Sequence, residues 1–164
     1  MQPLCEGELL SVFARNCEIR RINKPEASAF LNQYHRFGDA ACKYRYGIYV
    51  RRSTGAREFA MDAGTLVAVA EFSGARRWFK NGRTISSYEW VRYASLPYLS
   101  VVGGMGKVLK HFVEEVRPDD IMTYANQDWS DGGVYRALGF VQEESKSFSD
   151  GSRSLKFRLK ITDY

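Results

Sequence analysis

The sequence predicts a single α/β domain in which helices flank both faces of a mixed, mostly antiparallel sheet. Its 164 residues contain no internal repeat and no Pro- or Gly-rich linker, so one domain accounts for them. Short runs of β-branched and aromatic residues are separated by segments with helical periodicity. The resulting order is strand, helix, several antiparallel strands, helix, strand, helix and strand. This order fits neither a doubly wound fold nor a helix bundle.

Residues 17–22 alternate weakly and predict a first strand. Asn23 then offers a helix N-cap, with Pro25 in the first turn, and the helix should end near Gly38 because glycine is the usual C-terminal stop. The apolar stripe of this helix consists of Ala27, Phe30, Leu31 and Tyr34.

Two β-rich segments follow, residues 44–52 and residues 65–72. The second is almost entirely apolar, which predicts a strand buried on both faces. Asn81-Gly82 is a strong hairpin turn and should lead into a strand over residues 86–94.

A long helix is predicted from Gly104 onward, because its apolar residues are spaced three and four apart. These are Met105, Val108, Leu109, Phe112, Val113 and Val116. Residues 121–125 predict a strand, and Ser130 or Asp131 can cap a short helix that Gly139 ends. The tail predicts an alternating strand after an Asp-Gly turn, with apolar positions Leu155, Phe157, Leu159 and Ile161.

Composition excludes several classes of protein. Hydrophobic residues make up 45% of the chain and charged residues 26%, so it is not a disordered, collagenous or low-complexity protein. No stretch approaches the roughly 18 apolar residues of a membrane span, and no signal peptide is evident. Cys5, Cys17 and Cys42 lack a CxxC pairing, which predicts free thiols and a cytoplasmic location. The formal charge of +5 permits an acidic partner without requiring one.

A glycine cluster over residues 101–107 lies between a strand and the long helix. Glycines let the backbone approach a ligand, and the first amides of a helix face an anion, so the segment is a candidate pyrophosphate site. A tight turn is the alternative, and the pattern is neither a Walker A loop nor a dinucleotide fingerprint. The candidate cofactor-binding residues are Val102, Gly103, Gly104, Met105, Gly106 and Lys107.

Three segments resemble the Gcn5-related N-acetyltransferase (GNAT) family. Residues 88–97 are similar to that family's central strand and following proline, residues 104–109 to its glycine loop and helix, and residues 134–140 to its closing signature. The resemblance implies a GNAT-like fold and acyl transfer from acetyl-CoA or another acyl-CoA to an amine. Val101 stands where the family has Gln or Arg, so backbone amides would have to hold the cofactor.

A narrower resemblance is to a GNAT-like branch of phages and mobile elements that includes Mom-type DNA-modification proteins. It covers residues 34–38, 47, 89, 92, 102–104, 124, 129–130 and 135–140. This resemblance implies DNA base modification as an alternative function. A second alternative is a binding module that kept the fold and lost catalysis, which the altered Val101 position favours.

Tyr135 and Glu89 are candidates for proton transfer. Tyr135 matches the GNAT tyrosine that acts as general acid toward the leaving thiolate, and the alternative is a core position. Glu89 lies on a predicted strand and would act as general base, because a partly buried carboxyl group has a raised pKa. An ion pair with Arg92 or another base is the alternative.

His35 and Asp128 are the other catalytic candidates. His35 lies where a helix should end, and a hydrogen-bonded structural role is the commoner one for a single histidine. Asp128 and Asp131 would join His35 in a catalytic or metal cluster if the strand order brought them together; helix capping is the alternative, which we favour for Asp131. The usual metal-ligand spacings are absent, so we expect no metal site.

Basic residues gather near the predicted hairpin turns. Those around the aromatic pair Trp78 and Phe79 are Arg76, Arg77, Lys80 and Arg83. Cations interleaved with aromatic rings suit a nucleic-acid surface, and a solvated hairpin rim is the alternative. The acceptor amine therefore stays open between a small molecule, a protein and a nucleic acid such as DNA. No membrane partner is expected, and nothing in the sequence predicts an oligomeric state.

Overall fold

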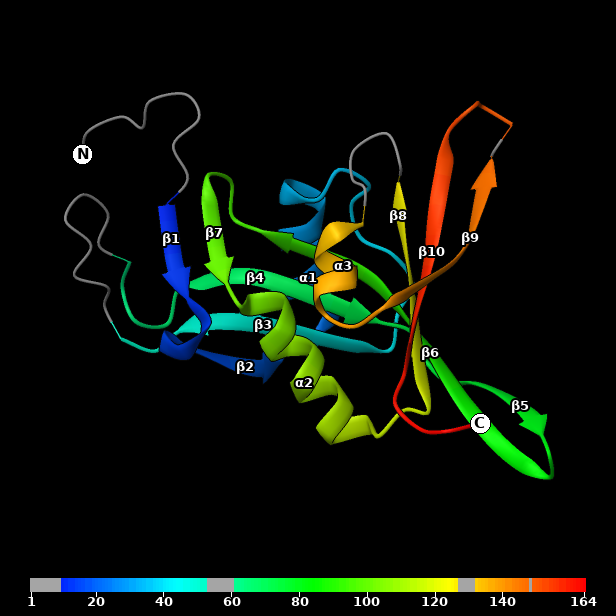
Figure 1. Cartoon of the computed structure of the whole chain (residues 1–164). Coiled ribbons are helices and arrows are strands. Elements are labelled where there is room, and N and C mark those ends of the chain that lie inside the picture. The colour runs from blue at the N-terminus through cyan, green and yellow to red at the C-terminus, as the bar shows by residue number, and fades with distance from the viewer. Residues whose placement is uncertain (1–9, 53–60, 127–131, 148) are drawn as a thin grey trace. The chain divides into compact units, whose positions relative to one another are not determined.

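The computed structural model describes residues 10–52, 61–126, 132–147 and 149–164, which form a mixed α/β fold with a mostly antiparallel sheet (Figure 1). The chain divides into two compact units. Unit 1 contains Met1–Glu71 and Arg92–Glu115, and unit 2 contains Phe72–Val91 and Val116–Tyr164. No helix among the described residues has the length and apolar character needed to cross a bilayer.

Unit 1 combines two helices with strands of two sheets. In chain order its described elements are β1 (Leu10–Phe13), the 3-10 turn η1 (Ala14–Asn16), β2 (Cys17–Arg21), α1 (Lys24–Tyr34), β3 (Tyr44–Val50), β4 (Leu66–Phe72), the end of β6 (Arg83–Ser95), β7 (Leu99–Val102) and α2 (Gly104–Val116). β2 pairs antiparallel with β3, β4 follows β3 in the sheet, and β1 pairs in parallel with β7. As predicted, β4 is buried from its second residue onward.

Both helices of unit 1 form where the apolar periodicity predicted them. The side chain of Asn23 accepts a hydrogen bond of 2.9 Å from the Glu26 N–H and caps α1. The buried face of α1 packs in a core cluster made of Ala27, Phe30, Leu31, Val69 and Ala94. α2 buries Val108, Leu109 and Phe112, so the helix that leaves the glycine cluster is anchored along its length.

Unit 2 is built on a four-stranded sheet with an added hairpin strand. Its described elements are β5 (Arg76–Lys80), most of β6, β8 (Asp120–Asn126), α3 (Gly133–Ala137), β9 (Val141–Ser147) and β10 (Arg153–Lys160). The strand order is β6-β8-β10-β9, and β5 pairs with β6. β6 and β8 are parallel, whereas the β5–β6, β8–β10 and β10–β9 pairs are antiparallel.

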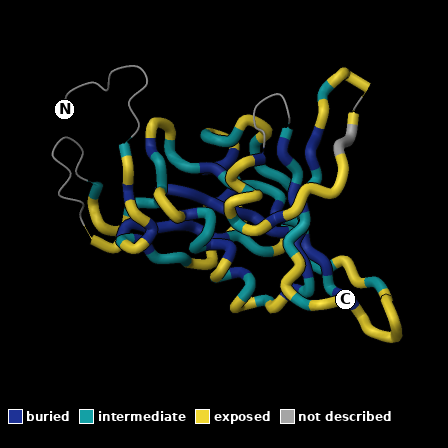
Figure 2. The backbone as a smooth tube through the Cα atoms, in the orientation of Figure 1, coloured by how far each residue is buried: buried dark blue, intermediate teal, exposed yellow. Residues whose placement is uncertain are grey.

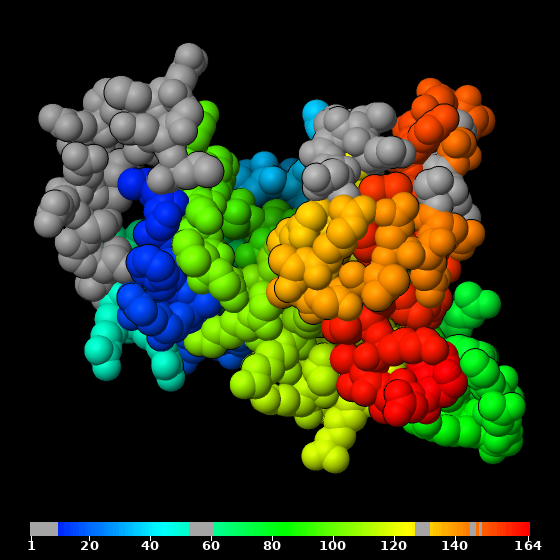
Figure 3. Space-filling view, viewed as in Figure 1, coloured from blue at the N-terminus to red at the C-terminus, as the bar shows by residue number. Residues whose placement is uncertain are grey.

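The β5–β6 hairpin has the turn predicted for Asn-Gly. Lys80 pairs with Arg83, and both turn residues are left-handed, with φ of 51° at Asn81 and 74° at Gly82. The tip of this hairpin is exposed (Figure 2). The C-terminal residues lie against it (Figure 3), because the Trp78 and Tyr164 rings meet edge to face with 5.4 Å between centroids.

Several boundaries differ from the prediction. α1 ends at Tyr34 with His35 as its C-cap, and Gly38 follows in a separate left-handed turn. The N-cap of α3 is Gly132 and not Ser130 or Asp131, which lie outside the described residues. At φ 77° a Cβ on residue 132 would meet the ring of Phe157 at 2.2 Å, so the chain needs glycine here.

Other differences concern strands. The short strands β1, β7 and β9 were not expected. Ile161 lies beyond the end of β10 and is exposed. The thiols of Cys17 and Cys42 are free, as predicted, and Cys5 lies outside the described residues.

A buried carboxyl group sits at the end of β4. The side chain of Glu71 is fully buried, and the Nε of Arg45 lies 3.6 Å from its Oε2. Burial, followed by the neighbouring carboxyl group of Asp39, raises the pKa of Glu71 to about 7. Burial raises the pKa of Asp39, but the neighbouring Glu71 and the hydrogen bond from the Ser28 hydroxyl outweigh it and hold that pKa below its usual value. Below about pH 7 Glu71 is therefore mainly protonated, whereas Asp39 is ionised above its lowered pKa.

This pair makes stability pH-dependent. A carboxyl group whose pKa is raised on folding stabilises the fold fully below its unfolded pKa, and this contribution is lost as pH rises through the folded pKa. Between the usual value of 4.5 and about 7, the free energy of unfolding should fall by an amount on the order of 3 kcal/mol. Glu71→Gln keeps the hydrogen-bonding shape without the titration, so it should flatten this decline in urea unfolding measured across that range. Glu114→Gln, at an exposed carboxylate of α2, is the control; an equally steep decline in Glu71→Gln would contradict the assignment.

Candidate functional site

The glycine cluster forms the passage from β7 into α2. Gly103 takes a left-handed conformation with φ 78°, and its carbonyl accepts the first helical hydrogen bond, 3.0 Å from the Lys107 N–H. The N–H groups of Gly104, Met105 and Gly106 precede that bond and have no acceptor within the helix. Val102 and Gly103 are exposed, so this end of α2 can receive an anionic group from solvent.

Packing alone requires glycine at position 104. A Cβ at this position would lie 2.7 Å from Cγ1 of Val101 and 2.9 Å from the hydroxyl oxygen of Tyr93. Val101 therefore covers the first turn of α2 with an apolar side chain. The GNAT resemblance places Gln or Arg at that position.

Lys107 holds the start of α2 against the preceding 3-10 turn. Its ammonium group donates to the carbonyl of Ala14 at 2.8 Å and also to the carbonyl of Cys17. Its positive charge thus stays beside the glycine cluster, whereas its hydrogen-bonding capacity is used within unit 1.

Glu89 lies on β6, and its backbone is hydrogen bonded to Ser73, the residue that follows β4. The hydroxyl of Ser73 accepts from the Glu89 N–H, and the Ser73 N–H donates to the Glu89 carbonyl, both at 2.8 Å. Glu89 borders a cavity of about 490 Å³ within unit 2. The other residues lining it are Ser73, Arg76, Trp78, Ser87, Tyr88, Met122, Tyr124, Lys156 and Arg158.

Tyr135 lies on α3 and packs against the opposite face of the same sheet. Its ring centroid is 6.1 Å from that of Trp90 and 5.7 Å from that of Phe157. Burial raises the pKa of Tyr135, and a hydrogen bond with Thr123 acts in the other direction. Because side chains alternate along a strand, Glu89 and Trp90 point to opposite faces, so the sheet separates Glu89 from Tyr135.

The parallel pairing of β6 with β8 stops beside Glu89. The paired positions run from Ser87–Asp120 to Glu89–Met122, although both strands continue. At the next position the hydroxyl of Thr123 donates to the Trp90 carbonyl at 3.0 Å in place of a backbone ladder bond. The sheet of unit 2 is therefore interrupted between the two candidate proton-transfer groups.

His35 is held within unit 1 as part of a turn. Its N–H donates to the Leu31 carbonyl at 2.8 Å, and its Nδ1 accepts from the Phe37 N–H at 3.0 Å. Burial, and then the charge of Arg92, lower the pKa of His35, so the neutral form is favoured. Arg92 donates to the Gly38 carbonyl at 2.9 Å in the same turn. Asp128, the remaining catalytic candidate, lies outside the described residues.

The hairpin cations divide between the two faces of β5. Arg76 and Lys80 share a face with Trp78, whereas Arg77 shares the other with Phe79, whose side chain is 79% exposed. Arg83 is tied to the C-terminal segment, donating to Asp119 at 2.6 Å and to the Asp163 carbonyl at 2.8 Å.

Sequence patterns did not indicate the supporting residues around Glu89 and Tyr135. Ser73, Thr123, Lys156 and Arg158 reach these positions through pairing between strands that are distant in sequence. Within residues 10–52, 61–126, 132–147 and 149–164, no group of three or more His, Cys, Asp or Glu side chains is arranged to hold a metal ion. The expectation of no metal site stays a prediction.

Known structures share this fold. No protein-family model and no curated protein matches the sequence. The spermidine/spermine N-acetyltransferase SpeG from Vibrio cholerae, in mutant forms, aligns with a TM-score of 0.54 and 9% identity over 88% of this chain and 94% of its own. A GNAT-family acetyltransferase from Bacillus cereus aligns with a TM-score of 0.52 and 10% identity over 90% of this chain and 99% of its own. FeeM, an N-acyl amino acid synthase from uncultured soil microbes, aligns with a TM-score of 0.55 and 11% identity over 88% of this chain and 92% of its own. The chain therefore has the fold of GNAT acetyltransferases.

The packing of Gly104 can be tested by stability. Gly104→Ala should lower the free energy of unfolding by about 1–3 kcal/mol, because its methyl group overlaps the Val101 side chain and the Tyr93 hydroxyl. Adding Val101→Ala removes one of the two overlaps, so the double variant should lose less than the sum of the two single variants. Chemical denaturation of the four proteins gives this coupling, and additive losses would contradict the contact.

Proposed function

We propose that the protein is an acyl-CoA-dependent N-acyltransferase that transfers an acetyl or related group to an amine. The observation that carries this proposal is the placement of Glu89 and Tyr135 on opposite faces of the sheet, beside the interruption between β6 and β8. A base on one face and an acid on the other can serve one reaction if the reacting carbonyl lies in the opening between them. The fold shared with acetyltransferases supports the same reaction class.

Acyl-CoA fits the residues at the start of α2. The N–H groups of Gly104, Met105 and Gly106 would face its pyrophosphate, with Val102 and Gly103 forming the exposed approach and the charge of Lys107 close by. Because these contacts use the backbone, they do not depend on the side chain at Val101. Bound acyl-CoA would supply the activated acyl group as a thioester.

Glu89 and Tyr135, both in unit 2, would transfer the protons. Glu89 would accept a proton from the acceptor's ammonium or amine nitrogen on the cavity face. Tyr135, whose pKa is raised by burial, keeps its hydroxyl proton at neutral pH and would donate it on the other face. Thr123, which bonds both Tyr135 and the Trp90 carbonyl, would hold the acid in place.

Modification of a nucleic-acid amine is the second candidate, and the face of β5 that carries Arg77 and Phe79 favours it. Phe79 is exposed there with Arg77 beside it, and Lys80 follows at the hairpin turn. An exposed aromatic ring between cations suits stacking and phosphate contact. A module that binds acyl-CoA without catalysis is the third candidate. Backbone amides at the start of α2 would bind the cofactor equally well in an enzyme and in such a module, so only an activity assay separates the two.

Activity distinguishes these candidates. With acetyl-CoA and an amine panel, free thiol should be released, and Tyr135→Phe should lower kcat at least about 100-fold while acyl-CoA affinity stays within about twofold. The control is Tyr98→Phe, which removes the hydroxyl from an exposed tyrosine. Equal turnover in the parent and Tyr135→Phe would assign Tyr135 to the core; acyl-CoA binding without thiol release from any amine would favour the binding module.

Salt dependence tests the nucleic-acid candidate. If β5 contacts DNA, each lost phosphate contact should reduce the slope of log affinity against log salt by about 0.9. Arg77→Gln combined with Lys80→Gln should therefore flatten the slope by up to roughly 1.8 for duplex DNA. Lys110→Gln, which removes an exposed charge on α2, should leave it nearly unchanged. No binding by the parent at low salt would remove this candidate.

A further inference from the structure

We propose that the cavity on the Glu89 face of unit 2 is the acceptor site, and that it selects a small amine that also carries a carboxylate or phosphate group. The inference rests on the proposed acyl transfer and adds to it the chemical class of the acceptor. It is drawn from what surrounds Glu89, which is a mainly polar lining with one aromatic wall and the three cations Arg76, Lys156 and Arg158.

The cavity has a mainly polar lining, and its large aromatic and apolar side chains are Trp78, Tyr88, Met122 and Tyr124. Trp78 is fixed in place, because its indole N–H donates to the hydroxyl of Ser87 at 2.8 Å and its ring packs on Tyr164. A volume of about 490 Å³ with one rigid aromatic wall and several polar lining residues suits a small polar amine.

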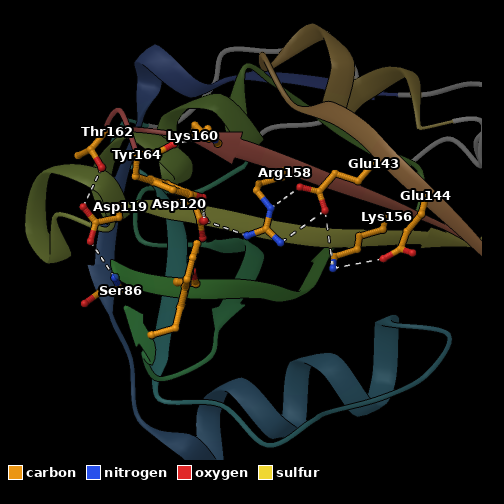
Figure 4. Close-up of polar contacts among 12 residues, drawn as sticks. Ser86, Asp119, Asp120, Glu143, Glu144, Lys156, Arg158, Lys160, Thr162 and Tyr164 are labelled. Atoms are coloured by element: carbon orange, nitrogen blue, oxygen red, sulfur yellow. Dashed lines mark hydrogen bonds and ion pairs between the residues drawn. The ribbon is translucent and has the colours of Figure 1, made fainter. Parts of the chain in front are cut away.

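Arg158 already donates its hydrogen bonds to carboxylates of the protein. Its Nη1 donates at 2.8 Å to Asp120, whose side chain is fully buried, and its Nε donates to Glu143 (Figure 4). The hydroxyl of Tyr164 also donates to Asp120. Arg158 therefore balances carboxylates of the protein itself and leaves little charge for a ligand.

Lys156 also pairs with carboxylates of the protein, but its contacts are longer than those of Arg158. The ammonium of Lys156 lies 3.7 Å from a Glu143 oxygen and 3.6 Å from a Glu144 oxygen, which is attraction without a hydrogen bond of ordinary length. Arg76 is exposed, and in the part of the chain that the structure describes no carboxylate lies within 4.0 Å of its guanidinium. Both side chains can therefore donate to a ligand.

Strand register puts these cations on either side of Glu89. Arg76 pairs with Ser87, two residues before Glu89 on β6, which places the Cα atoms of Arg76 and Glu89 about 8 Å apart. Lys156 pairs with Tyr124 on β8, two residues beyond the partner of Glu89. An acceptor whose amine meets Glu89 can thus present an anionic group a few ångströms away to either cation.

The test is equilibrium binding without acyl-CoA, measured by isothermal titration calorimetry on three matched pairs. Each pair differs by its anionic group: L-phenylalanine and 2-phenylethylamine, adenosine 5′-monophosphate and adenosine, O-phosphoethanolamine and ethanolamine. We expect the anionic member of at least one pair to bind about tenfold or more tightly than its partner. The pair with the largest difference identifies the source of the anionic group. Equal or reversed affinities in all three pairs would overturn the inference.

Variants assign that preference to particular side chains. Arg76→Gln and Lys156→Gln should each reduce the preference about tenfold. Arg77→Gln, which removes the same charge from the other face of β5, should leave it unchanged. If Arg77→Gln reduces the preference as much as Arg76→Gln does, general electrostatics and not the cavity is responsible, and the proposal fails. Because Arg76 is exposed, its replacement tests the site even if Lys156→Gln fails to fold.

Separate acyl-CoA titration keeps the two proposals distinguishable. Acyl-CoA binding with no preference in any pair would remove the acceptor assignment and leave the proposed function intact. Selective binding of the anionic amines with no acyl-CoA binding would support the selectivity of the cavity and overturn the proposed function.

Discussion

The point at which β6 and β8 cease to pair governs the chemistry available to unit 2. A continuous ladder would satisfy the backbone of both strands and close the sheet between its faces. Here the last parallel pair is Glu89–Met122, and the hydroxyl of Thr123 takes over the Trp90 carbonyl at the next step. One side-chain hydrogen bond therefore satisfies the Trp90 carbonyl without closing the sheet. It also lies beside the hydroxyl of Tyr135, which links the interruption to the candidate acid.

The buried carboxyl groups of Asp120 and Glu71 differ in their hydrogen-bond and ion-pair partners. Asp120 accepts hydrogen bonds from Arg158 and from the hydroxyl of Tyr164. Glu71 is fully buried, lies 3.6 Å from Arg45 and neighbours the carboxyl group of Asp39, so its pKa is raised and protonation is favoured. The first arrangement stiffens the wall of the cavity beside Glu89. The second makes the stability of unit 1 respond to pH.

The start of α2 is held in place by packing and hydrogen bonds within the protein itself. Gly104 is confined by Val101 and Tyr93, and Lys107 is bonded to two carbonyls of the segment before β2. These contacts fix the direction of the first amides of the helix. An anion-binding helix end is useful only when its amides are held in place before the ligand arrives, because their ordering then costs nothing on binding.

The sequence by itself determined the elements whose signals are local. Helical spacing predicted α2, an Asn cap predicted the start of α1, and Asn-Gly predicted the β5–β6 turn, because each depends on neighbouring residues alone. Short strands such as β1 and β7 escaped prediction, since four residues carry little periodicity and their partners are distant in sequence. The glycine cluster, Glu89 and Tyr135 were identifiable as candidates from sequence and family resemblance. Only the tertiary structure decided that Glu89 and Tyr135 lie on opposite faces of one sheet, and that Arg76 and Lys156 flank Glu89, because strand register sets those positions.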